Sequence, residues 1–82
     1  MKRFKVTDPL GRDLTVVQYQ VNTTDVFQVA GKDLAPVIIV KAEAQNGDTF
    51  WATLPEDPSR YRDAQLSGAA ISAHLKQQDV LL

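Results

Sequence analysis

The chain has 82 residues, and nine Lys plus Arg stand against ten Asp plus Glu for a formal charge of −1. This length fits a single domain, residues 1–82, and the balanced charge argues against a general nucleic-acid coat, which needs a strong positive field. The lack of cysteine argues against a disulfide-rich secreted scaffold and excludes a thiolate metal cage. No apolar run approaches the length of a signal peptide or of a membrane-spanning helix, so we expect a cytoplasmic protein with no membrane contact.

The first two predicted elements are strands over residues 3–7 and 14–21, where apolar and polar residues alternate. Residues 8–11 read Asp-Pro-Leu-Gly, a composition typical of a type I turn. The register that we expect pairs Thr7 with Leu14, Phe4 with Val17, and Val6 with Thr15.

The segment from Asn22 to Pro36 allows two interpretations. Residues 26–30 form a short third strand, which their β-branched content favours, or a single helical turn with Asp25 as N-cap and Gly31 at its end. Pro36 marks the start of the next element, because proline cannot donate to a strand ladder.

Residues 37–45 and 48–54 form the clearest hairpin, and the apolar pattern decides its turn. A two-residue turn at Asn46 and Gly47 would mix apolar and charged residues on one face of the sheet. A three-residue loop of residues 45–47, with Gly47 in the left-handed conformation, avoids this mixing. The loop sets the pairs Ala44 with Asp48, Ala42 with Phe50, Val40 with Ala52, and Ile38 with Leu54.

A C-terminal helix is predicted over residues 58–79, with Asp57 or Ser59 as its cap and Pro58 at its first position if Asp57 is the cap. One stripe on this helix has a spacing of three and four: Tyr61, Ala64, Gly68, Ile71 and Leu75. Ala64 and Gly68 are small, so the helix can lie close to the sheet there. We expect the last two members of the stripe to be buried against Phe4, Val17, Val40 and Phe50.

These elements predict an α+β fold, with a β-rich region over residues 3–54 and the helix packed on one face. The sheet is antiparallel, with four or five strands in meander order. The stretch Gly47-Asp48-Thr49-Phe50-Trp51-Ala52 resembles the middle hairpin of SH3-like barrels. The acidic loop and the Pro-Ser-Asn-Tyr pattern of SH3 domains are missing, so none of that family's binding residues is assigned here. A small SH3-like barrel with an added helix is the alternative fold.

The residues that could carry chemistry do not combine into a catalytic or metal-binding pattern. His74 is the one histidine, and neither Ser67 nor Ser72 lies three or four residues from it. The aspartates fall in or beside predicted turns, and the glycines occur singly, so no phosphate-binding loop is present. We expect no enzyme activity, no cofactor and no metal.

Two groups of residues suggest binding. If the helix covers the face that holds Phe50, the opposite face of the sheet is open and suits protein binding. Its predicted contact residues are Trp51, Val37, Ile39, Lys41, Thr49 and Thr53. The second group interleaves basic and aromatic side chains that could stack single-stranded bases: Lys41, Trp51, Arg60, Tyr61 and Arg62.

The sequence therefore favours a small non-enzymatic protein-binding module, an inhibitor, adaptor or regulator that self-associates as a homodimer or binds another protein. A single-stranded nucleic-acid-binding protein is the first alternative. A small enzyme or enzyme subunit, with a site shared across a dimer, is the second.

Overall fold

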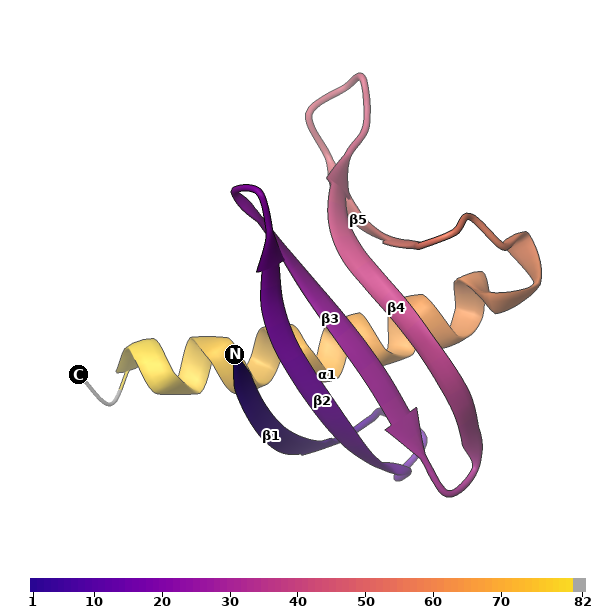
Figure 1. The fold of residues 1–82 in the computed structure, drawn as a ribbon, viewed down its shortest axis with the longest axis vertical. Coiled ribbons are helices and arrows are strands. Elements are labelled where there is room, and N and C mark those ends of the chain that lie inside the picture. Colours follow the sequence, from indigo (N-terminus) through magenta and orange to yellow (C-terminus); the bar gives the residue numbers. More distant parts are fainter. Residues whose placement is uncertain (81–82) are drawn as a thin grey trace.

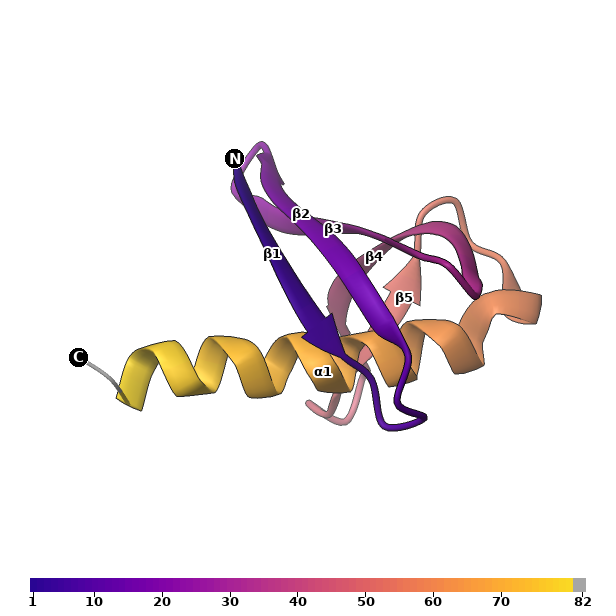
Figure 2. The same ribbon diagram turned by 90° about the horizontal axis from the view of Figure 1, so that it is seen from below.

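The computed structural model describes residues 1–80, with the side chains of residues 1–77. Its sheet has five antiparallel strands in the order β1-β2-β3-β4-β5, and one helix crosses a single face of that sheet (Figures 1 and 2). The strands are β1 (Lys2–Thr7), β2 (Asp13–Val21), β3 (Thr24–Gly31), β4 (Leu34–Glu43) and β5 (Thr49–Thr53). A short 3-10 turn (Pro58–Arg60) leads into α1 (Tyr61–Val80). The predicted fold class is confirmed, and the described sheet is not closed into a barrel.

The β1–β2 hairpin has a register one residue away from our prediction. Phe4 pairs with Val16 rather than Val17, and Val6 pairs with Leu14. The predicted turn is present, because the Gly11 amide donates to the Asp8 carbonyl at 2.9 Å. The ladder continues into this turn, where the Asp8 amide donates to the Arg12 carbonyl, so the connection is tighter than we expected. A one-residue slip moves every side chain to the other face, and Leu14 and Val16 therefore point towards α1.

The uncertain segment forms a strand, so the helical-turn interpretation is wrong. β3 pairs along its length with β2, and Asn22 has a positive φ of 59° in the tight turn between them. β4 begins at Leu34, before Pro36. The β3–β4 ladder shifts between Val29 and Gly31, so Pro36 falls at an irregularity where a missing amide is tolerated.

The β4–β5 hairpin has the predicted register. Ala42 pairs with Phe50 and Val40 with Ala52, while Gly47 has φ 90°. The Gly47 amide donates to the Ala44 carbonyl at 2.9 Å, which closes the three-residue loop. The assignment of residues to two opposite faces of this hairpin is therefore correct, although the helix covers the face that we expected to be open.

Asp57 caps the turn before α1, as one of our two alternatives predicted. Its side chain accepts from the Ser59 amide at 3.1 Å, and Pro58 occupies a first-turn position where its missing amide costs nothing. The predicted stripe of α1 is largely correct, since Ala64, Gly68 and Ile71 are buried. Tyr61 is exposed instead, and its hydroxyl donates to Glu56.

The core lies between one face of the sheet and α1. Its members are Leu14, Val16, Phe27, Val29, Leu34, Val37, Ile39, Trp51, Ala64 and Ile71, with Phe4, Val6 and Leu75 partly buried against them. We expected Val17, Val40 and Phe50 in this core, and that expectation is wrong because they lie on the opposite face. No helix within residues 1–80 is both long and apolar enough to cross a membrane.

Candidate functional site

Trp51 lies beneath α1, so our prediction that its face of the sheet is open is wrong. Trp51 is 8% exposed, and its indole meets Phe27 edge-on at a centroid distance of 5.5 Å. The neighbouring predicted contact residues Val37, Ile39 and Thr53 are also buried. Lys41 and Thr49 are exposed. The argument for a protein-binding surface at Trp51 required an exposed indole, and the indole is buried.

The close approach of α1 to the Trp51 face depends on the fit between this ring and Gly68. A methyl group on Gly68 would fall within the indole of Trp51, so the ring takes the space that a side chain would fill. Gln65, one helical turn earlier, accepts from the Trp51 amide at 3.3 Å and donates to the Trp51 carbonyl at 2.5 Å. These contacts also satisfy backbone groups on the outer edge of β5.

The basic and aromatic group proposed for nucleic-acid binding does not form one surface. Trp51 is covered and cannot stack a base. Arg60 donates to the Ala35 carbonyl at 2.7 Å and pairs with Asp63 at 3.0 Å. Arg62 remains exposed near the start of α1.

The face of the sheet away from α1 is the strongest candidate for a binding site, and we call it the open face. One row across it joins Tyr19, Val26, Val40 and Ala52 by direct cross-strand pairing. The next row joins Val17, Gln28 and Ile38, and the Leu54 amide donates to the Ile38 carbonyl at 2.9 Å. Phe50 extends the open face beside Ala42.

The open face has a packed centre and an exposed apolar rim. Val26 is only 2% exposed although no helix covers it, because it lies between Tyr19 and Val40 in the sheet. Phe50 is 40% exposed and Leu54 47% exposed, both at the β5 side of the face. The partly exposed Ala52 lies between these two side chains on the same face, and a continuous exposed apolar surface is typical of an interaction site.

Charged residues are absent from the central rows of the open face. Among the described residues, the positions on it from Val17 of β2 to Ala52 of β5 carry no Asp, Glu, Lys or Arg. The nearest charges on the strands of this face lie at the β1 side, where Arg3 and Lys5 of β1 and Asp13 of β2 share the face with Val17. Depletion of charge at the centre is what distinguishes the core of a protein interface from ordinary surface.

A cluster of charged side chains joins the β1–β2 turn to α1 and has a structural role. The buried Asp8 carboxylate accepts from the Leu10 amide at 3.0 Å, the Arg12 amide at 2.8 Å and the Arg12 Nε at 2.7 Å. Arg12 also reaches Asp63 of α1 at 3.4 Å. Burial is the largest single influence on Asp8 and would raise its pKa, but the hydrogen bonds and charge of Arg12, with the Leu10 amide, together lower that pKa below 3.8.

The side chains considered for catalysis are placed in the core or packed at its edge. Ser67 of α1 is 0% exposed, so its hydroxyl cannot reach a substrate. The His74 ring stacks on Phe4 with centroids 4.2 Å apart and planes 4° apart. Within the described residues, no group of three or more His, Asp or Glu side chains could hold a metal ion.

Sequence reasoning did not place Phe50, Leu54, Ile38 and Val40 on the open face, because it assigned their face to the core. The signal that could have corrected this was Gly68, because its missing side chain leaves room in the helix stripe for the large ring of Trp51. Comparison of the chain with known protein families, curated proteins and solved structures gives no match.

Proposed function

We propose that this chain is a small non-enzymatic protein-binding module that self-associates through the open face of its sheet. The observation that carries the proposal is a sheet face whose central rows are uncharged and mostly apolar, with Phe50 and Leu54 at its exposed rim. A module of this kind serves as an inhibitor, adaptor or regulator, because its activity consists of the contacts that it makes.

A second copy of the chain suits the open face as its occupant. A two-fold interface brings the same patch of both subunits together, so a charged patch would place like charges opposite one another. The open face avoids that penalty, since its central rows are uncharged. Two sheets can pack face to face about 10 Å apart, with their apolar side chains interdigitated.

The exposed area is consistent with an unpaired interface. The chain exposes 5735 Å², whereas a compact monomer of this mass exposes about 4,900 Å². This surplus of roughly 800 Å² comes from the projecting end of α1 as well as from the open face, and one partner contributes about 800 Å² to a standard interface. Within residues 1–80, α1 lies against one face of the sheet and no element covers the open face (Figure 2).

The test is the oligomeric state of the wild type and two variants, measured by sedimentation velocity across a concentration series. Phe50→Asp places a charge in the interface and should weaken self-association at least about thirtyfold, which corresponds to ~2 kcal/mol. Leu10→Asp is the matched control, because Leu10 is 55% exposed in the β1–β2 turn and lies outside the open face.

The expected result is a wild type and a Leu10→Asp variant that dimerise with equal affinity, beside a monomeric Phe50→Asp variant with an unchanged circular dichroism spectrum. A wild type that stays monomeric at millimolar concentration would refute self-association. Equal dimerisation of all three proteins would place the interface elsewhere.

A further inference from the structure

The edge strand β1 leaves a row of backbone groups facing outward. In an antiparallel ladder, successive residues point their amide and carbonyl groups alternately to one side and the other. The Asp8 amide donates to the Arg12 carbonyl of the β2 side at 2.9 Å, which fixes the phase of this alternation. The backbone groups of Thr7, Lys5 and Arg3 therefore face away from β2, at the outer edge of the described sheet.

The charge on β1 opposes pairing with a second copy at this edge. β1 reads Lys-Arg-Phe-Lys-Val-Thr and contains no acidic residue. If two β1 strands paired around a two-fold axis at Phe4, Arg3 of one copy would lie opposite Lys5 of the other. Like charges directly opposite one another destabilise a sheet, so this edge is protected against self-pairing.

The helix extends past β1 far enough to support another strand. The Phe4–His74 stack marks the point where α1 lies beside β1. From His74, α1 continues six residues to Val80, about 9 Å at 1.5 Å per residue, whereas neighbouring strands lie about 4.8 Å apart. Figures 1 and 2 show this end of α1 projecting beyond the sheet on the β1 side.

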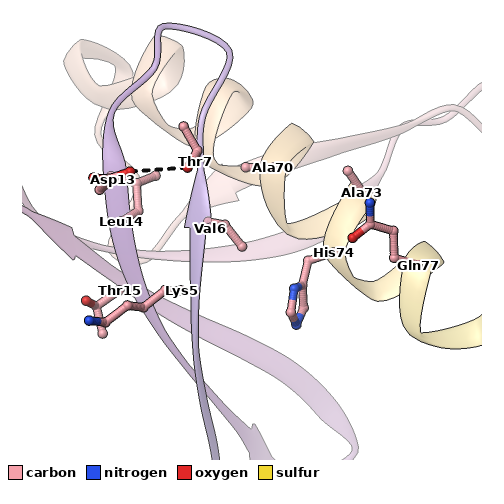
Figure 3. Close-up of a pocket in the computed structure, with 10 residues that line it drawn as sticks. All are labelled: Lys5, Val6, Thr7, Asp13, Leu14, Thr15, Ala70, Ala73, His74 and Gln77. Carbon is pink, nitrogen blue, oxygen red and sulfur yellow. Dashed lines mark hydrogen bonds between the residues drawn. The ribbon is translucent and has the colours of Figure 1, made fainter. Parts of the chain in front are cut away.

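A groove occupies the angle between β1 and the projecting helix. It has a volume of about 630 Å³. One wall is formed by β1 together with the paired residues of β2, Asp13 among them, and the other wall by α1. In Figure 3, Val6 and His74 extend towards one another from these walls, and the small side chains of Ala70 and Ala73 leave the space open. An outward edge, a cationic strand and a groove backed by a helix thus coincide.

We infer that the β1 edge and this groove bind an extended acidic segment of another protein, which pairs with β1 as a sixth strand. Main-chain hydrogen bonds to Arg3, Lys5 and Thr7 supply general affinity, as in other complexes formed by strand addition. Cross-strand neighbours supply the selectivity. Residues of the segment on the α1 side meet Phe4 and Val6, which are partly buried and apolar.

On the other side of the added strand, the neighbours are Arg3 and Lys5. The preferred segment therefore alternates apolar residues towards α1 with Asp or Glu towards Arg3 and Lys5. The outward backbone of β1 lies beyond the central rows of the open face, and Arg3 and Lys5 stand at the margin of that face, so strand addition does not require the dimer. The Phe50→Asp variant should bind the acidic segment as the wild type does. Self-association and strand addition can therefore be tested, and can fail, independently.

The test uses a fluorescein-labelled peptide that alternates Val and Glu, with blocked ends, in fluorescence anisotropy titrations. A peptide that alternates Val and Lys is the control for charge, and a Val-Glu peptide with alternate amides methylated is the control for strand pairing. Lys5→Glu should weaken binding of the Val-Glu peptide at least about tenfold. Lys32→Glu makes the same charge change in the exposed β3–β4 turn and should leave binding unchanged.

Hydrogen exchange on the wild type locates the peptide. The expected result is slower exchange of the Arg3, Lys5 and Thr7 amides in the presence of the Val-Glu peptide, and weak binding of the methylated peptide. Any of four results would overturn the inference: no binding at about 1 mM peptide, equal binding of the Val-Lys or methylated peptide, equal affinity of Lys5→Glu, or protection confined to other strands. Self-association that protects β1 amides would assign the edge to a second copy and also overturn it.

Discussion

Gly68→Ala tests the close approach of α1 to Trp51, because two opposing effects of known size meet at this position. Alanine is favoured over glycine in a helix interior by about 1 kcal/mol. Overpacking a core costs about 1–3 kcal/mol. The cost should lie at the upper end, since the new methyl group would fall within the body of the indole rather than at the end of a flexible side chain. We expect a net loss of about 2 kcal/mol in the free energy of unfolding.

Urea titrations followed by circular dichroism measure this loss, and fluorescence of Trp51, the one tryptophan, reports on the packed ring. Ala69→Gly is the control for helix propensity, because Ala69 is exposed on the same turn and should lose only about 1 kcal/mol. Combining Gly68→Ala with Trp51→Phe should recover at least ~0.5 kcal/mol relative to the sum of the single changes. A Gly68→Ala variant more stable than the wild type would refute the contact.

Asp8→Asn should be less stable than the wild type near neutral pH, and the difference in the free energy of unfolding should shrink as the pH falls below 3.8. The reason is that Asp8, with its lowered pKa, stabilises the fold only while its carboxylate is charged. Urea titrations across this pH range measure the difference, and a difference that does not change with pH would contradict this role of Asp8. Ile71→Ala should cost about 2–5 kcal/mol and Leu75→Ala distinctly less, since Ile71 is fully buried and Leu75 only partly, and equal losses in denaturant would be inconsistent with this packing. Gln65→Leu should speed hydrogen exchange at the Trp51 amide by removing its acceptor, while unchanged exchange would mean that another group shields this edge.

The β4–β5 hairpin could be predicted in detail because its determinants are local. Only one register keeps Phe50 off the face that carries Lys41 and Glu43, and Gly47 supplies the positive φ that the three-residue loop requires. The cap at Asp57 and the buried stripe of α1 could also be predicted from the sequence, since each depends on residues a few positions apart. These parts of the fold need no knowledge of distant contacts.

The choice of the covered face could not be made from the same pattern, because both faces of β4 and β5 are apolar. Which face α1 covers depends on the fit of Trp51 against Gly68. These residues lie on different elements, so a periodic pattern within one element does not reveal their contact. The β1–β2 register would have helped, but it is set by the Asp8–Arg12 pairing inside the turn, which tightens the connection. With that register, Leu14 and Val16 fall on the Trp51 side, and the candidate site moves to Phe50 and Leu54.

The order of the elements along the chain also governs how the protein is exposed while it is being made. Each strand pairs with its immediate successor, so the sheet can assemble from short-range contacts as synthesis proceeds. α1 is made after β5, and until then the face that holds Leu14, Ile39 and Trp51 has no helix to cover it. A nascent chain that has completed β5 therefore presents two apolar sheet faces to other chains. The interval before α1 arrives is when aggregation is most favoured.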